Sequence, residues 1–317
     1  MRVLHITVNY PTTQHPIFGI FVKEQVESLK ALGLECDVYF SNGLELSGKK
    51  THISSIRQIR HLLRSQRFDI IHCHHSISAL ILLLSGYAFI NKCVVSYQNA
   101  PEREFGGKLL FWILYLFFER IIIKNTSELC KYQRVLYLPN GVNSNFFKPL
   151  DKLECKTKLG LDKDKRYILY MDSNVGKRTQ KRHDRYLEVI NILSKEYDNI
   201  KSLELTNTPR ELIPLYMNAC ELHLLTSDFE GSPNSVKECL CCNTPVVSTN
   251  VGNVKDMIGD IPGCYVDNTF SVIQLANYSS KVLSSTTEFK GRDMFLKKGY
   301  DIQSVAIELK NLYETIK

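Results

Sequence analysis

The sequence predicts an α/β protein with two doubly wound lobes. Short apolar segments alternate with amphipathic ones up to residue 138, the alternation stops over residues 139–149, and it resumes near residue 166. Alternating strands and helices are typical of parallel sheets, because parallel neighbours need a crossover connection whose helix covers a sheet face. The chain has 317 residues, which is enough for two domains of ordinary size.

The two lobes are expected over residues 1–149 and 150–300, followed by a terminal segment over 301–317. Pro139, Asn140-Gly141 and Pro149 mark the linker between them. We expect strands at 2–8, 35–40, 68–74, 92–97, 166–173, 201–207, 221–227 and 244–251. We expect helices at 21–33, 78–90, 109–118, 181–197, 209–219 and 304–317, and another that begins near Pro233.

The composition restricts the partners and the compartment. The net charge of +7 is dispersed, which suits an anionic ligand or an acidic membrane surface but does not indicate nucleic-acid binding. The ten cysteines are scattered, and the first residues lack the apolar core of an export signal. We therefore expect a cytoplasmic protein with reduced thiols.

The most apolar stretch, residues 109–118, is too short to span a bilayer. Lys108 precedes it and Glu119-Arg120 follows it. One interpretation is a helix buried in the first lobe. The other is a helix that rests on the inner membrane surface, with residues 108–124 as a peripheral contact near a lipid-linked substrate, and the two are compatible.

Ligands of doubly wound sheets bind in the loops beyond the carboxyl ends of the strands. Gly19 lies in the first such loop, where its missing side chain lets a ligand approach, but no Gly-x-Gly-x-x-Gly sequence indicates a dinucleotide. In the strand expected at 68–74, the side chains of His72 and His74 point to the same face of the sheet. Three interpretations stand for them: His74 contacts a ligand hydroxyl, both are structural, or they ligate a metal.

A basic run follows the strand at 166–173. Such a run is usually a solvated face, yet its place at a strand's carboxyl end makes it a candidate clamp for a diphosphate. Its members are Lys177, Arg178, Lys181, Arg182 and Arg185.

The segment 229–247 carries two glutamates on either side of a small turn. Ser232 is expected to cap the following helix, with Pro233 in its first turn. The backbone N–H groups of Asn234 and Ser235 then form an anion site at the positive end of the helix dipole. The flanking carboxylates of Glu230 and Glu238 suit hydroxyls better than phosphate, so the site suits a nucleotide-sugar.

This segment resembles the Glu-x7-Glu motif of retaining glycosyltransferases of family 4, which have the two-lobed GT-B fold with Rossmann-like lobes and a cleft between them. Segments 19–25, 138–149, 177–184 and 214–227 extend the resemblance along the chain. It implies that Glu238 binds the nucleotide's ribose, Glu230 lies by the donor sugar, and the backbone from Gly231 to Ser235 holds sugar and phosphate. It also implies that the terminal helix crosses back to the first lobe.

The resemblance further implies that Arg178 and Lys181 bind the diphosphate, that His74 meets the donor sugar, and that Gly19 belongs to a loop over the donor. The family's basic pair is commonly five residues apart; here the spacing is three, and Lys177 is a rival. No metal and no cofactor are implied. The implied reaction moves a sugar, from a UDP-sugar by our expectation, with retention onto a saccharide or lipid-linked saccharide in surface polysaccharide synthesis.

Three alternatives remain. The protein could bind nucleotide-sugars without catalysis, or be an epimerase of the same fold. It could also be a metal or redox protein that uses Cys239, Cys241 and Cys242 with the histidines, although only Cys239 and Cys242 have a zinc-site spacing.

Overall fold

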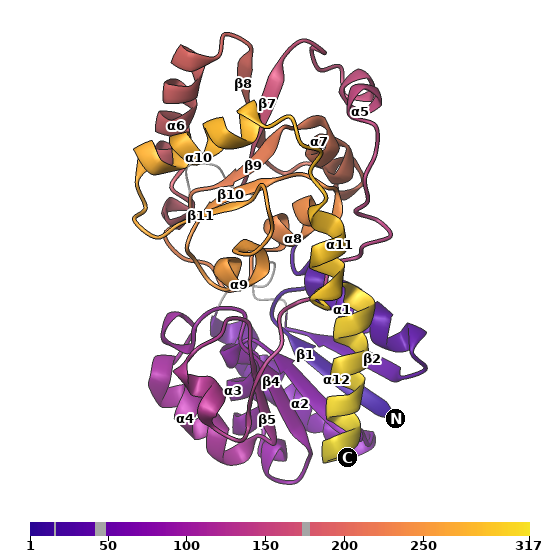
Figure 1. Cartoon of the computed structure of the whole chain (residues 1–317). Helices are drawn as coiled ribbons and strands as arrows, with labels where there is room; N and C mark the ends of the chain where they lie inside the picture. Colours follow the sequence, from indigo (N-terminus) through magenta and orange to yellow (C-terminus); the bar gives the residue numbers. More distant parts are fainter. Residues whose placement is uncertain (16, 42–48, 173–177) are drawn as a thin grey trace. The chain divides into compact units, whose positions relative to one another are not determined.

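The computed structural model describes residues 1–15, 17–41, 49–172 and 178–317 (Figure 1). The chain divides into two compact units. Unit 1 contains Met1–Gly141 together with Ile302–Lys317, and unit 2 contains Val142–Asp301. The division therefore falls after Gly141 rather than after residue 149, and the terminal helix α12 (Ile302–Ile316) belongs to unit 1.

Unit 1 is built on a six-stranded sheet in which every registered pair of strands is parallel. The strand order is β2-β1-β3-β4-β5-β6. The strands are β1 (Arg2–Thr7), β2 (Glu35–Phe40), β3 (Ile70–His74), β4 (Cys93–Ser96), β5 (Arg120–Ile123) and β6 (Val135–Tyr137). Helices cover both faces, as expected for parallel strands that are buried on both sides.

Each face of this sheet has its own apolar core. On one face, Val3, Ile70 and Val94 pack with apolar residues of α1 and α12. On the other, Leu4, Ile71 and Val95 pack with apolar residues of α2, α3 and α4. The remaining helices of the unit are α1 (Ile20–Ala31), α2 (Lys49–Ser65), α3 (Ser76–Leu84), η1 (Tyr87–Phe89), η2 (Pro101–Arg103), α4 (Gly107–Phe117) and η3 (Glu128–Lys131).

Unit 2 repeats the plan with a five-stranded parallel sheet of order β11-β10-β9-β7-β8. The strands are β7 (Arg166–Met171), β8 (Ile200–Leu205), β9 (Leu222–Leu225), β10 (Val246–Thr249) and β11 (Tyr265–Asp267). The helices are α5 (Lys152–Lys158), η4 (Thr179–Lys181), α6 (His183–Glu196), η5 (Arg210–Leu212), α7 (Ile213–Ala219), α8 (Asn234–Cys241), α9 (Val254–Ile258), α10 (Val272–Ser284) and α11 (Gly291–Lys297). Alternate residues of β7 again face different cores.

The predicted fold class is confirmed, and one segment differs from expectation. The apolar stretch does form helix α4, but the helix ends at Phe117 and residues 120–123 form strand β5. Ile121, Ile122 and Ile123 lie inside the sheet and are at most 1% exposed. They cannot contact a membrane, so any contact within 108–124 is limited to the helix.

Candidate functional site

In each sheet, the order of the strands creates one position, at the carboxyl ends of the strands, where a ligand is expected to bind. In unit 2 the chain runs from β7 outward to β8 and then returns to add β9 on the other side of β7. Loops at such a topological switch point diverge and leave room for a ligand beyond the carboxyl ends of the strands. The loops after β7 and β9 carry Arg178, Lys181 and Glu230.

Lys181 and Glu230 meet directly in this place. The Lys181 Nζ atom lies 2.6 Å from Glu230 Oε1, and both side chains are nearly buried. Glu230 Oε1 also accepts a hydrogen bond of 2.8 Å from the Ser227 hydroxyl. A lysine ammonium and a carboxylate, 49 positions apart in the sequence, therefore share one position between the two loops.

Arg178 is placed more openly. Its Nη1 atom lies 3.7 Å from Asp172 Oδ1, and 42% of its side chain is exposed. Its guanidinium is therefore accessible at the end of β7, as a phosphate ligand requires. The rival Lys177 lies outside the described residues.

The two loops are held together by hydrogen bonds. Arg185 donates to the Thr226 carbonyl at 2.6 Å and to Asp228 at 2.9 Å. The Asp228 N–H donates to the Gln180 carbonyl at 2.8 Å. These bonds fix the position of Lys181 relative to Glu230, because they join the two segments that contain these residues. Arg185 is therefore a structural member of the basic run, and Arg182 likewise pairs with Asp184 and Asp228.

Helix α8 begins one residue later than expected. Pro233 is its N-cap residue, with extended backbone angles, and no side chain caps the helix. The prediction that Ser232 is the cap is wrong: its hydroxyl instead accepts a hydrogen bond of 3.1 Å from Lys237 Nζ. The N–H groups of Asn234 and Ser235 still belong to the first turn, where helix geometry provides no partner for them. An uncapped start leaves these donors available to an anion.

The Ser235 side chain turns away from that anion position. Its hydroxyl lies 3.0 Å from His223 Nε2, and His223 Nδ1 lies 3.1 Å from the Leu169 carbonyl. Because a carbonyl only accepts, His223 Nδ1 carries the proton and Ser235 donates to Nε2. Burial lowers the pKa of His223 to about 4, so this arrangement is neutral and stable at physiological pH.

Lys237 places a second amino group below the helix start. It is fully buried, and burial lowers the pKa of its ammonium to about 7, against the opposing influence of Glu238. Its contact with Ser232 supports the turn from Gly231 to Pro233 from the inside. The sequence alone gave no reason to select this residue, since it reads as an ordinary lysine of an amphipathic helix.

Glu238 is held by an arginine that the sequence reasoning missed. Glu238 Oε1 lies 2.7 Å from Arg210 Nη1, and the carboxylate side chain is only 5% exposed. The Arg210 guanidinium also stacks on Phe147, 4.8 Å from the ring centroid. The contact with Arg210 therefore holds the Glu238 carboxylate in one orientation. One feature of the sequence could have identified Arg210: it lies at the start of a segment that follows the end of a strand.

Gly231 is fixed by a close backbone contact. A Cβ atom at Gly252 would lie 2.1 Å from the Gly231 carbonyl oxygen, and Gly252 has a φ of +55°. The N–H of Asn253 donates to the same carbonyl at 3.2 Å. The loop after β10 thus supports the loop that carries Glu230 and Gly231, and only glycine fits at position 252.

This contact gives a testable prediction. Gly252→Ala forces the Gly231 loop to move, so we expect nucleotide affinity to fall at least about tenfold, with loss of about 2 kcal/mol or more of folding stability. The matched control is Gly160→Ala, which has a φ of +66° but nothing within 4 Å of the added Cβ. Calorimetric titration with UDP and thermal unfolding measure both variants. Equal affinity in the two would contradict the proposed role of the loop.

The cysteines of α8 are core residues. Cys239, Cys241 and Cys242 are buried, and burial raises the pKa of each thiol. Metal ligation and redox exchange need the thiolate, which this environment disfavours. The helix is followed by Asn243 in the left-handed conformation, with a φ of 55°.

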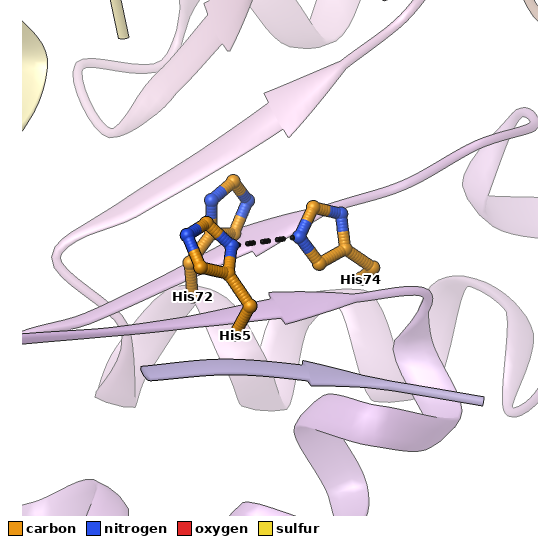
Figure 2. A group of neighbouring side chains, drawn as sticks. All are labelled: His5, His72 and His74. Carbon is orange, nitrogen blue, oxygen red and sulfur yellow. Dashed lines mark hydrogen bonds between the residues drawn. The ribbon is translucent and has the colours of Figure 1, made fainter. Parts of the chain in front are cut away.

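In unit 1, the side chain of His74 is buried. Figure 2 shows it beside His5 and His72 within the sheet, and all three are fully buried. His74 Nε2 lies 3.1 Å from His5 Nδ1. The contact between His74 and a donor sugar therefore stays a prediction, and the burial of the side chain counts against it.

These histidines also do not form a metal site in this geometry. They are grouped closely enough, with one ligand atom of each within 4.8 Å of the others. However, the rings of His72 and His74 stack 4.4 Å apart at 22°, so their in-plane lone pairs do not converge on a point close to both rings. Both nitrogens of His72 are already engaged, by Tyr313 at 2.5 Å and Ser96 at 2.8 Å.

The next residue, His75, is the accessible histidine at this strand end. Its φ of 72° is in the left-handed region, which is strained for histidine. Its Nε2 accepts a hydrogen bond of 2.8 Å from the Asn9 amide, and its Nδ1 lies 3.7 Å from Glu104. Asn9 and His75 follow β1 and β3, which flank the switch point of this sheet. The signal in the sequence is the doubled histidine at 74 and 75, of which only His74 was predicted as a ligand contact.

Gly19 supports the same corner. It has a φ of +67°, and a Cβ there would lie 2.3 Å from the Asn9 carbonyl carbon and oxygen. Gly19 therefore permits a close backbone approach, as expected, but the group that approaches is the Asn9 backbone. Its proposed contact with a donor remains a prediction.

Comparison with known proteins agrees with this architecture. Residues 203–301 match the family model described as glycosyl transferases group 1. A sucrose-phosphate synthase from Thermosynechococcus elongatus is similar with a TM-score of 0.77 and 14% identity, over 99% of each chain. HepE from Anabaena, solved in complex with UDP, has a TM-score of 0.72 and 12% identity over 99% of this chain and 100% of that one.

A glycosyltransferase from Rickettsia africae is also similar, with a TM-score of 0.73 and 14% identity over 99% of this chain and 98% of that chain. The fold is GT-B. No curated protein sequence matches the chain. Among the described residues, no helix is both long and apolar enough to cross a membrane.

Proposed function

We propose that this chain is a retaining glycosyltransferase that transfers a sugar from a UDP-sugar to a saccharide or lipid-linked saccharide. The observation that carries the proposal is the Lys181–Glu230 pair, at 2.6 Å, beside the uncapped start of α8 and at the switch point of the unit 2 sheet. The match of residues 203–301 to glycosyl transferases group 1 supports it, since that range includes both glutamates. HepE binds UDP, which supports the choice of donor.

In this proposal, cationic side chains and backbone N–H groups of the chain bind the UDP leaving group. Lys181, Arg178 and the N–H groups of Asn234 and Ser235 bind the diphosphate, while Glu238 accepts hydrogen bonds from ribose hydroxyls and Glu230 lies by the donor sugar. The bond from the anomeric carbon to the distal phosphate oxygen breaks, and the acceptor oxygen bonds to that carbon from the same face. The acceptor proton passes to the phosphate oxygen, which leaves UDP and a glycoside of retained configuration.

Charge develops on the distal phosphate as the bond breaks. Donors aimed at that oxygen therefore stabilise the transition state more than the bound donor, which raises the rate. The proposal assigns this role to the cations and the helix start, and it needs no metal. The ten cysteines, all free of disulfides, support a reducing compartment and hence a reaction on the cytoplasmic side. We propose a surface polysaccharide as the product class, with α4 as a peripheral membrane contact.

The test is a panel of UDP-sugars incubated with the purified chain and a membrane fraction. We expect one donor to release UDP. We also expect NMR to show that the product has the same anomeric configuration as the donor. Binding without UDP release across the panel would instead indicate an inactive binding protein. Interconversion of two UDP-sugars without UDP release would indicate an epimerase.

A comparison of adjacent histidines tests the unit 1 side. We expect His75→Ala to lower kcat/KM about tenfold, equivalent to about 1.4 kcal/mol, because the substitution removes the partner of Asn9 and Glu104 at the switch point of this sheet. We expect His74→Ala to act on folding instead, since it empties a buried position and leaves His5 without its partner, at a cost of about 2–4 kcal/mol. Steady-state kinetics and denaturant unfolding measure the two effects. The reverse pattern would restore His74 as the ligand residue.

A further inference from the structure

One face of unit 1 exposes an unusual amount of apolar surface. Helix α3 packs against α2 on one side and against α4 on the other, so the three lie side by side over the sheet. Where α3 ends and α4 runs, eight large apolar side chains are exposed. This apolar patch consists of Leu84, Phe89, Ile90, Phe105, Leu109, Trp112, Leu116 and Phe117.

Members of the patch on neighbouring elements are in contact. The rings of Phe89 and Phe117 are in contact, with centroids 4.9 Å apart, so the patch joins η1 to α4. Leu109 and Leu116 are 75% and 69% exposed, and lie two turns apart on the same face of α4. Single exposed apolar residues are normal on a protein, but a contiguous group usually marks a binding surface.

A basic face adjoins the patch. Residues 49–68, which include α2, contain no aspartate or glutamate. The exposed arginines of this segment, Arg57, Arg60, Arg64 and Arg67, form what we call the basic face. Arg60 connects the two surfaces, because its Nε donates at 3.1 Å to the carbonyl of Ser85, the neighbour of Leu84. Lys108, at the other end, keeps 72% of its side chain exposed.

We infer that the apolar patch and the basic face together dock this chain on a bilayer that contains anionic phospholipid. Apolar side chains enter the boundary between headgroups and acyl chains, while arginines beside them bind the headgroup phosphates. A second copy fits the face less well. A two-fold interface places the same surface on both subunits, so the basic faces would meet without acidic residues of α2 to neutralise them.

The inference deepens the proposed function, on which it rests for its purpose, since a lipid-linked acceptor is met at such a surface. It extends the expected contact from α4 to α2 and η1. Binding is nevertheless measurable without any sugar transfer, so failure of the proposed activity and failure of the docking are separate results.

Trp112 makes the test direct, because it is the only tryptophan of the chain and belongs to the patch. The full chain is titrated with vesicles of phosphatidylcholine, alone or with phosphatidylglycerol. We expect a blue shift of the emission and sedimentation with the anionic vesicles, weakened by salt. Absence of binding to anionic vesicles overturns the inference, as does equal binding to neutral ones.

Substitutions in the apolar patch and in the basic face test whether these two surfaces bind the vesicles. We expect Leu109→Glu with Leu116→Glu, and separately Arg57→Glu with Arg64→Glu, each to weaken vesicle binding at least tenfold. Ile273→Glu, at a position that is 68% exposed on α10, is the apolar control, and Lys195→Glu with Lys201→Glu makes the same charge change on unit 2. The controls should bind as the wild type does. Loss in the controls, or a dimer in sedimentation velocity that only the patch variant abolishes, overturns the inference.

Discussion

Replacing Lys181 with methionine is expected to lower the rate of sugar transfer about 10²–10³-fold, which corresponds to about 2.7–4 kcal/mol of transition-state stabilisation. The ammonium that lies 2.6 Å from Glu230 is nearly buried, so its interaction with a leaving phosphate is weakly screened by water. Methionine keeps the length of the side chain and removes the charge. The Glu230 carboxylate then remains beside the phosphate without its partner, which adds repulsion to the loss of attraction.

The measurement separates binding from catalysis. Titration with UDP gives the donor-side affinity, and initial rates at saturating donor give kcat. We expect kcat to fall more than affinity, because the charge on the distal phosphate grows only as the bond breaks. Lys195→Met, on the exposed face of α6, is the control and should leave both unchanged. A kcat for Lys181→Met within threefold of the wild type would refute the assignment.

Stability is expected to fall steeply on acidification, because the chain buries His5, His72, His74 and His223. Burial lowers the pKa of His5 from 6.5 to about 3, that of His223 to about 4, and those of His72 and His74 well below 6.5. The folded state therefore stays unprotonated where the unfolded chain already binds protons.

The sign follows from proton linkage. Below pH 6.5 the unfolded chain holds more protons, so the free energy of unfolding decreases as the pH falls, until the folded pKa values are reached. The slope is at most about 1.4 kcal/mol per pH unit for each histidine. Between pH 6.5 and pH 5, His5 alone contributes a loss of about 2 kcal/mol, and His72 and His74 act in the same direction.

Denaturant unfolding at pH 7.5, 6.0 and 5.0 measures this loss. His5→Gln should reduce the slope, since it removes one buried titrating ring of unit 1. His61→Gln is the control, because His61 is exposed on α2 and should leave the slope unchanged. A pH-independent free energy of unfolding between pH 7.5 and 5.0 would show that these rings do not titrate as their burial requires.

Much of the fold was predictable because it depends on local patterns. The segments that became β1, β3, β4, β7, β9 and β10 are short apolar runs next to turn residues, and each was expected within a few positions. Strands β5, β6 and β11 were not expected. Strand β5 begins three residues after the apolar helix α4 ends, and β6 and β11 have three residues each, so none of them stands out as a separate apolar run.

The candidate site was predictable as a set of chain positions, not as a set of contacts. The sequence selected Arg178, Lys181, Glu230 and Glu238 because they follow strand ends in a pattern that resembles a known motif. It did not pair Lys181 with Glu230 or Arg210 with Glu238, since each pair joins segments whose approach depends on the order of strands in the sheet.

The two histidines at the end of β3 show what a sequence pattern does not determine. Sequence pattern by itself determined the parallel α/β architecture, the position of the binding loops and the chemical character of their residues. Only the tertiary structure decided that His74 turns into the core and His75 outward, because the strand ends between them and the chain adopts a left-handed conformation at His75. A single backbone angle thus changes which imidazole is accessible, and no local sequence pattern specifies that angle.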